Sequence, residues 1–501
     1  MFAVVVLMAG AGGGYGAVDA AYQNLRVFSE LCWRGSPGHL TNASFHDELY
    51  EILMYHGGDG EKFRETRRLH VEAPREHAKT TCVSVVYPLW RIGRDRNIRV
   101  VVVSRTGALA TSINREVRRN IEGNQRYREV FPEVVPSSPW GDEAFQVERT
   151  QIMKSPTFYG VGLEGSMTGM RADLLILDDP YDLNEMRTEA SRERVREWIE
   201  SVAMPVLVPD GEIVFICTRW HEDDYAGRIL GRSVENGGDW VVKVYRAVEN
   251  LDDPVDQWKA LWPEKWPPHL LEKRRRDIGS LMFKSLYQND PAGIKGALFK
   301  SDWLSYYDPL VFDPATVGHM MFVMAVDPAI SESPEADQTA ITTIAVDRRT
   351  RDIYLLDVWV GRISFPDQVK KIVEYAQRSH LPFIPKPASI GKVGVESTAY
   401  QKALYSSIYQ YGLPVVEVKH SRGSKWERML GMQPHFENGR IKLPDPNKIR
   451  VNWMDKFTEE YINYPRGKHN DILDSLEIAV EIAGETRGKS SMSYWMRPGR
   501  V

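Results

Sequence analysis

The stretch RRLHVEAPREHAKTTCVSVVYPLW, from Arg67 to Trp90, decides how the first half of the chain folds. It predicts a short strand at Leu69–Glu72, a tight loop, and an apolar helix that begins with Lys79 and Thr80. A strand, a loop and a helix that begins with Lys-Thr can bind phosphate. The N–H groups and the dipole at the helix start attract an anion, and the lysine adds a full charge. Thr80 would offer its hydroxyl to a magnesium ion.

The stretch departs from the usual P-loop pattern, G-x-x-x-x-G-K-[ST]. Ala73 and Ala78 occupy the two glycine positions. If the second position needs a positive φ, alanine there costs about 1–2 kcal/mol, and the loop either follows another path or accepts that strain. A second candidate, GKS at 488–490, has no strand before it and no clear helix after it. The context therefore favours Lys79.

The composition bounds the protein class. A length of 501 residues predicts two or three domains, and the apolar and charged content is ordinary for a globular protein. A net charge of −4 argues against a chain that coats nucleic acid everywhere but allows local basic grooves. The three cysteines lack ligand or disulfide spacing, which favours a reducing, intracellular setting. The apolar start, MFAVVVLMAGAGGGYG, is too short to span a membrane and is a poor signal peptide.

Buried strands alternate with helices after the loop. The β-branched run NIRVVVVS, the run Ala172–Leu177 and the segment GEIVFIC each predict a strand buried on both faces. Helical patterns separate them, which predicts a doubly wound α/β sheet. Asp178 and Asp179 follow the second strand, at the edge where such a sheet places its chemistry. Thr218 ends the third strand in the same way.

These polar strand ends suit nucleotide hydrolysis. In a P-loop NTPase the first acid binds magnesium and the second can orient the attacking water. Asp179 reaches less far than the commoner Glu, and Thr218 could sense the γ-phosphate. A simpler interpretation exists for each feature. The two acids could form a solvated Asp-Asp-Pro turn, and Thr218 could be an ordinary strand-to-loop exit. The combination with Lys79 favours function.

A second α/β module follows a Pro/Gly-rich connector. Its first buried strand ends at Asp327, and the next two predict an antiparallel hairpin with a turn at 347–352. A later strand ends at Glu396, and the last helix carries Asp471 and Asp474 three positions apart on one face. The order of these acids along the chain is more informative than any one acid, which alone is most often solvated.

Convergence of these acids would form a metal centre. Like carboxylates cluster only with cations between them, and carboxylates suit magnesium or manganese. If Asp327, Glu396 and Asp471 converge, two Mg²⁺ or Mn²⁺ ions about 3.5–4 Å apart would activate a water and stabilise the leaving oxygen at a phosphodiester. His469 could orient an acid or protonate a leaving group, although a solvated loop histidine is the simpler reading.

Together, EAPREHAKTT, LLILDDP, CTRWHEDD, AVDPA, GVEST and KHNDILDSLE resemble the large terminase subunit of tailed bacteriophages and prophages, from about Phe45 to Ile482. That family joins a DNA-translocating ATPase to a nuclease of RNase H-like fold. It cuts concatemeric viral DNA and drives it into a procapsid through the portal. The resemblance implies an α/β protein in which a P-loop NTPase-type parallel sheet with flanking helices precedes an RNase H-like nuclease domain.

The resemblance also implies roles for individual residues. Arg75 would contact the γ-phosphate, Asp179 would be the catalytic acid of the ATPase, and Thr218 would lie in the coupling motif. The expected nucleotide-binding residues are Arg75, Glu76, His77, Ala78, Lys79, Thr80, Thr81, Asp178 and Thr218. The expected metal ligands are Thr80, Asp178, Asp327, Glu396, Asp471 and Asp474, the last replacing or supporting Asp471. The expected catalytic set is Asp179, Arg75, Asp327, Glu396 and Asp471.

The predicted organisation follows from these motifs. It comprises a leader and helical lead-in (1–60), an ATPase domain (61–290), a linker (291–319), a nuclease domain (320–485) and a basic tail (486–501). The resemblance implies ATP with Mg²⁺ at the first site and two Mg²⁺ or Mn²⁺ at the second. Expected partners are double-stranded DNA, the portal protein, the small terminase subunit and further copies in a ring on the portal, with no membrane. The expected location is the host cytoplasm during assembly, not the mature virion.

Two alternatives remain open. One is a helicase-type or repair ATPase–nuclease that acts without a capsid. The other is a catalytically degenerate prophage remnant, for which the two missing glycines are the only support.

Overall fold

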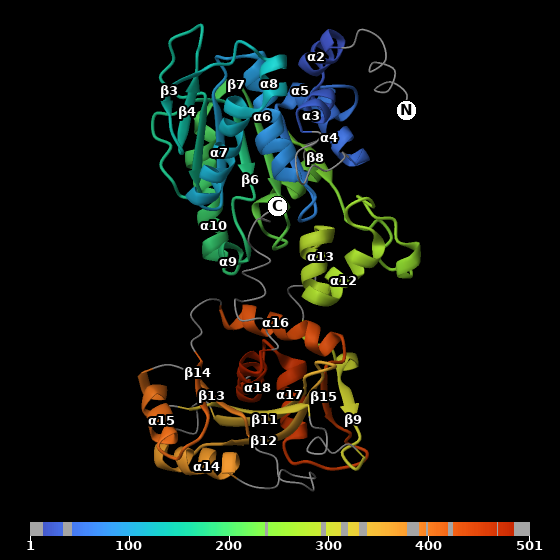
Figure 1. Ribbon diagram of the computed structural model, residues 1–501, viewed down its shortest axis with the longest axis vertical. Coiled ribbons are helices and arrows are strands. Elements are labelled where there is room, and N and C mark those ends of the chain that lie inside the picture. Colours follow the sequence, from blue (N-terminus) through green and yellow to red (C-terminus); the bar gives the residue numbers. More distant parts are fainter. Residues whose placement is uncertain are drawn as a thin grey trace. The chain divides into compact units, whose positions relative to one another are not determined.

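The computed structural model describes residues 14–33, 43–235, 239–291, 297–311, 319–329, 338–377, 390–396, 399–418, 424–467 and 469–484 (Figure 1). They form two compact units. The first contains the described residues up to Arg275 together with Leu281–Ile294, and the second contains Arg276–Ser280 and the described residues after 296. The start of the predicted leader, the GKS segment at 488–490 and the basic tail lie outside the described residues.

The first unit is built on an eight-stranded sheet in the order β3-β4-β5-β2-β6-β7-β1-β8. From β5 to β8 in that order the strands are parallel, and β3 and β4 extend the sheet in antiparallel fashion. The strands are β1 (Arg68–Glu72), β2 (Val100–Ser104), β3 (Pro136–Trp140), β4 (Ala144–Val147), β5 (Phe158–Gly162), β6 (Ala172–Asp178), β7 (Leu207–Cys217) and β8 (Val241–Val244).

The strand order places the three predicted strand ends side by side. β7 pairs with β1 on one side and with β6 on the other, both in parallel. The loop after β1, Thr218 after β7 and Asp178 at the end of β6 therefore meet at one edge of the sheet. All five residues of β2 are buried, as its run of valines predicts.

The following helices lie wholly or mostly in the first unit, and α7 packs against β5 and β2. They are α2 (Gly14–Gln23), α3 (Leu25–Trp33), α4 (Ser44–Leu53), α5 (Asp59–Thr66), α6 (Tyr87–Arg94), α7 (Gly107–Gly123), α8 (Gln125–Val130), α9 (Leu183–Met186), α10 (Glu189–Trp198), α11 (Tyr225–Glu235), α12 (Pro268–Ile278) and α13 (Ser280–Gln288). A π-helical turn, Thr81–Val86, precedes α6. Within the described ranges, no helix has both the length and the apolar character that crossing a bilayer requires.

The second unit has a seven-stranded sheet in the order β14-β13-β10-β11-β12-β15-β9. The pairs β10–β11 and β11–β12 are antiparallel, which includes the predicted hairpin, and the remaining pairs are parallel. The strands are β9 (Ser305–Tyr307), β10 (Met320–Asp327), β11 (Thr339–Asp347), β12 (Ile353–Gly361), β13 (Lys392–Glu396), β14 (Val415–Val418) and β15 (Ile441–Pro444). β9 lies inside the segment predicted as a linker, so part of that segment is an edge strand of the sheet rather than a connector alone.

Helix α18 (Asp471–Ile482) forms the centre of the second unit. It packs against β10, β11 and β13, and nearly all of its residues are buried, including Asp471 and Asp474. The other helices are α14 (Phe365–Gln377), α15 (Ala399–Tyr409), α16 (Lys425–Glu437) and α17 (Met454–Asn463). The buried first turn of α18 brings acids from the end of the chain to the middle of the sheet.

Candidate functional site

The loop between β1 and the following helix accepts backbone strain. The φ of Ala78 is +60° and that of Glu76 is +61°, both in the left-handed region. The helix begins at Lys79, as predicted. The chain therefore follows the strained path, which costs alanine about 1–2 kcal/mol relative to glycine. Contacts from outside the loop hold it in place, because Arg75 N donates to Leu286 O at 2.9 Å and Lys265 Nζ donates to Glu76 O at 2.8 Å.

Lys79 lies at the centre of the first site and is only 6% exposed. Its Nζ forms an ion pair with Asp179 Oδ2 at 2.8 Å and donates to Thr218 Oγ1 at 2.9 Å. Thr218 N in turn donates to Asp179 Oδ1 at 2.8 Å. Three residues singled out from separate motifs are thus joined in one hydrogen-bonded group.

Asp178 is buried beside this group. It accepts hydrogen bonds from Thr80 Oγ1 at 3.0 Å and from Ser84 Oγ at 2.7 Å. Burial, reinforced by the charge of Asp179, raises the pKa of Asp178 to about 7. Thr80 and Asp178 present the hydroxyl and carboxylate oxygens that suit Mg²⁺, so the residues fit the predicted ion. Sequence analysis missed Ser84, although its spacing of four from Thr80 places both on one helix face.

Arg75 supplies the second cation of this site. Its Nη1 is buried, and no described residue accepts a hydrogen bond from it. Burial lowers the pKa of Arg75, and the charge of Asp179 opposes that shift. A buried donor without an acceptor is costly, so Arg75 fits a site that takes up an anion.

The remaining predicted contacts belong to the loop and the helix start. Glu76 and Ala78 form the strained part of the loop, and Thr81 begins the π-helical turn. His77 donates from Nδ1 to Arg75 O at 2.8 Å. Burial lowers the pKa of His77 to about 3, so its ring is neutral at pH 7 and stabilises the loop.

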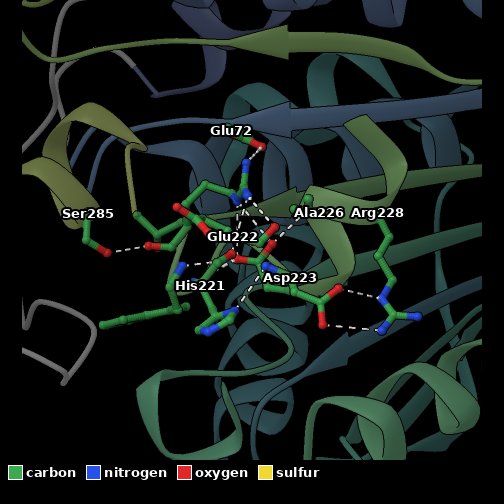
Figure 2. A network of polar contacts seen from close by, with 12 residues as sticks. Glu72, His221, Glu222, Asp223, Ala226, Arg228 and Ser285 are labelled. Carbon is green, nitrogen blue, oxygen red and sulfur yellow. Dashed lines mark hydrogen bonds and ion pairs between the residues drawn. The ribbon is translucent and has the colours of Figure 1, made fainter. Parts of the chain in front are cut away.

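A buried ionic network begins at the residue after Thr218, and Figure 2 labels Glu72 and Ser285 among its members. Arg219 follows Thr218 in the chain; its Nε donates to Asp224 Oδ1 at 3.0 Å and its Nη1 to Glu72 Oε1 at 3.1 Å. All three charged residues are at most 6% exposed. The Ser285 hydroxyl donates to Arg219 O, which adds α13 to the network. Arg219 therefore joins the end of β1, the end of β7, the start of α11 and α13.

The second site gathers the predicted acids at another sheet edge. β10 and β13 are parallel neighbours with Val326 opposite Val395, so the next residues, Asp327 and Glu396, end adjacent strands at the same edge. Burial raises the pKa of Asp327 well above its usual range, and the charges of Asp474, Asp471 and Glu396 raise it further. The predicted acids therefore act on one another electrostatically.

Polar side chains surround this acid cluster, which consists of Asp327, Glu396, Asp471 and Asp474. Lys425 Nζ forms an ion pair with Asp474 Oδ2. Glu460 Oε2 accepts from Ile472 N at 2.9 Å and anchors the start of α18. His469 Nδ1 lies 3.8 Å from Asp471 Oδ2, which is beyond hydrogen-bond distance, so its role in orienting that acid stays a prediction. Sequence analysis missed Lys425 and Glu460, since neither belongs to a motif.

The acid cluster has the oxygen donors of a metal site, but its side chains are not arranged around a common point. Asp474 Oδ1 is buried, and no described residue donates to it. Among the described residues, no three His, Cys, Asp or Glu side chains stand close enough together to hold a metal ion. The carboxylates suit Mg²⁺ or Mn²⁺ by chemistry, and their role as ligands stays a prediction.

Known proteins resemble the chain in sequence and in structure. Residues 324–481 match the model of the terminase RNaseH-like domain. The terminase large subunit of Enterobacteria phage T3 is 28% identical over 141 residues, which are 28% of this chain and only 23% of that relative. The large terminase of a thermophilic bacteriophage covers 89% of this chain and 100% of its own, with a TM-score of 0.51 and 10% identity. The HK97 bacteriophage large terminase covers 92% and 99%, with a TM-score of 0.39 and 12% identity.

The likeness to the thermophilic phage protein shows the fold, and the family model independently identifies the domain in the second unit. The chain is a mixed α/β protein with a parallel sheet in its first unit and an RNase H-like second unit. Its resemblance to the large terminase subunits of phages is thereby confirmed, and it is most specific over residues 324–481, which match the terminase RNaseH-like domain.

Proposed function

We propose that this chain is an ATP-driven DNA packaging motor that also cuts DNA, as the large subunit of a terminase. The observation that carries the proposal is the presence of two separate charged centres, each at the carboxyl ends of strands. One places Lys79 and Arg75 beside Asp178 and Asp179, and the other is the acid cluster. A centre with buried cations suits a triphosphate, and a centre of carboxylates suits metal ions.

In the first unit, Lys79 and Arg75 would hold the phosphates of ATP, and Thr80 and Asp178 would hold its Mg²⁺. Bound ATP supplies the phosphoanhydride whose cleavage drives the motor. Lys79 would leave Asp179 for the phosphates, which frees the Asp179 carboxylate to orient a water. Thr218 touches both of these residues, so its hydroxyl would register the change and pass it along β7.

In the second unit, Asp327, Glu396 and Asp471 would hold two Mg²⁺ or Mn²⁺ ions, with Asp474 as a further ligand. Bound ions supply an activated water and stabilise the charge that develops at the phosphodiester. The chain's own residues hold and orient these ions, and Glu460 fixes the helix end that carries Asp471.

The proposed function implies partners and a place in the cell. The substrate would be concatemeric double-stranded viral DNA, and the partners would be the portal protein, the small terminase subunit and further copies in a ring. The site of action would be the host cytoplasm during assembly. The ATPase domain would extend over 61–290 and the nuclease domain over 320–485.

A crossed pair of variants tests the proposal. Lys79→Ala should abolish DNA-stimulated ATP hydrolysis and leave metal-dependent DNA cutting intact, and Asp327→Ala should do the reverse. Unchanged hydrolysis in the first variant would refute the ATPase assignment, and persistent cutting with Mg²⁺ or Mn²⁺ in the second would refute the nuclease assignment. DNA strand opening without binding to a portal or to a small terminase subunit would favour the helicase-type alternative instead.

A further inference from the structure

The acid cluster is paired with a cation, Lys425. Its Nζ forms an ion pair with Asp474 Oδ2 and donates to Asn470 Oδ1 at 2.9 Å. Lys425 is the first residue of α16, whereas Asn470 and Asp474 belong to the start of α18. The ammonium also acts electrostatically on Asp327, at the end of β10. Lys425 therefore faces the acids of two different elements.

The exposure of this ion pair is unequal. The Asp474 side chain is 11% exposed and that of Lys425 is 44% exposed. The lysine thus reaches a buried carboxylate from the solvent side, and it can swing away without leaving its own charge buried. Asp474 cannot withdraw in the same way, because it lies in the buried first turn of α18.

The two oxygens of Asp474 differ as well. Lys425 forms its ion pair with Oδ2, while Oδ1 is buried and receives no hydrogen bond from any described residue. Buried carboxylates that repel one another need a positive charge nearby. Without metal, the ammonium of Lys425 provides that charge at the same carboxylate that a divalent ion would use.

We infer that Lys425 is an internal placeholder cation, which compensates the acid cluster in the metal-free chain and must leave Asp474 when a divalent metal binds. This inference rests on the proposed metal-dependent nuclease and assigns Lys425 a positioning role in it. Lys425 keeps the carboxylates together before the metal arrives, and it sets the metal concentration at which the site fills.

The test is metal binding by the full chain rather than cutting. Mn²⁺ is titrated without nucleotide and followed by electron paramagnetic resonance, and Asp327→Asn identifies the binding that belongs to the acid cluster. Lys425→Met keeps the side-chain length and removes the charge, so it should tighten this binding by about 2- to 5-fold, the factor that an ion pair of this exposure contributes. Lys425→Arg keeps the charge and should bind Mn²⁺ as the native chain does.

Two further measurements separate this role from a structural one. In EDTA, Lys425→Met should unfold at lower temperature than the native chain, and added Mn²⁺ should raise its melting temperature by more than it raises that of the native chain. Lys442→Met is the matched control, because Lys442 Nζ pairs with Asp352 Oδ2 at 2.6 Å elsewhere in the same unit. It should leave Mn²⁺ affinity unchanged.

The outcomes distinguish the role of Lys425 from the existence of the metal site. If Lys425→Met folds and its Mn²⁺ affinity is unchanged or weaker, the placeholder role is refuted while the metal site stands. If the native chain shows no Mn²⁺ binding that Asp327→Asn removes, the proposed nuclease centre and the role of Lys425 both fall.

Discussion

The two centres balance their charges in opposite ways. In the first, Lys79 pairs with Asp179 and donates to Thr218, and Asp178 accepts hydrogen bonds from two hydroxyls. In the second, carboxylates act on one another, and Lys425 is the cation that forms an ion pair with Asp474. In the proposed function, ATP would therefore displace existing bonds at the first centre. In the proposed function, metal ions at the second centre would instead add positive charge to carboxylates that repel one another.

The largest expected effect comes from the buried ionic network around Arg219. Arg219→Met removes the cation shared by the buried Glu72 and Asp224, which among the described residues keep only His70 and backbone N–H groups as partners. The loss of this buried ion pair should destabilise the first unit by about 3–5 kcal/mol. Hydrogen exchange of β1 and β7 amides measures this, because it reports each unit separately. Arg26→Met is the control, since the pair of Arg26 with Asp47 is more exposed, and it should cost less than about 1 kcal/mol. Equal effects of the two variants would mean that the network is not structural.

Two buried histidines allow the pH dependence of stability to be compared between the units. Burial lowers the pKa of His77 in the first unit to about 3, and burial with the charge of Arg440 does the same for His435 in the second. Because the unfolded chain takes up a proton at about pH 6.5 and the folded chain does not, stability is full above about pH 6.5 and falls on acidification towards pH 3. The loss should be about 1.4 kcal/mol per pH unit for each histidine.

The variant His77→Gln should flatten this pH dependence in the first unit alone, and His435→Gln should do so in the second alone. Denaturant unfolding at a series of pH values, read by hydrogen exchange in each unit, measures the difference. Profiles parallel to that of the native chain would contradict the neutral, buried state of these rings.

Ser84 tests whether the first centre is preorganised for magnesium. The variant Ser84→Ala removes one of the two hydroxyls on Asp178 and should weaken Mg²⁺-dependent ATP binding about tenfold, the typical loss of a hydrogen bond to a charged group. Metal-dependent cutting should not change. Isothermal titration with a non-hydrolysable ATP analogue provides the measurement, and Ser29→Ala, which removes a buried hydroxyl contact to Tyr50, is the control. Equal affinity in both variants would show that Asp178 does not need this support.

The smallest effect concerns the two alanines in the loop. Ala78→Gly should relieve the positive φ and stabilise the first unit by about 0.5–1 kcal/mol, after allowance for the greater freedom of glycine in the unfolded chain. Ala73 has no positive φ, so Ala73→Gly should destabilise by a similar amount. Thermal unfolding compares the two, and destabilisation by both would mean that the loop carries no strain at Ala78.

Local patterns made much of the first centre predictable. Lys79, Thr80 and the acids after β6 stand in motifs whose physical roles are known, and buried valine runs identify parallel strands. The strain at Ala78 also followed from the P-loop pattern as one of two possibilities. The strand order was not predictable in this way, because β7 is inserted between β1 and β6 by pairings between distant segments.

The residues that support the two centres could be identified only from the structure. Arg219 reaches Glu72 across 147 positions, and Lys425 reaches Asp474 across 49, and no periodicity records such contacts. The antiparallel strand β3 was missed because its sequence, PSSPW, has neither β-branched residues nor apolar alternation. The sequence therefore identifies the acids and cations that stand in motifs, but it does not show which distant residues contact one another.

The most direct test of two separate centres is an anomalous-diffraction structure of the chain with an ATP analogue and Mn²⁺. We expect one manganese peak beside Thr80 and Asp178, with the triphosphate on Lys79, and further peaks among Asp327, Glu396 and Asp471. Manganese at only one of these places, or a triphosphate away from Lys79, would contradict this expectation.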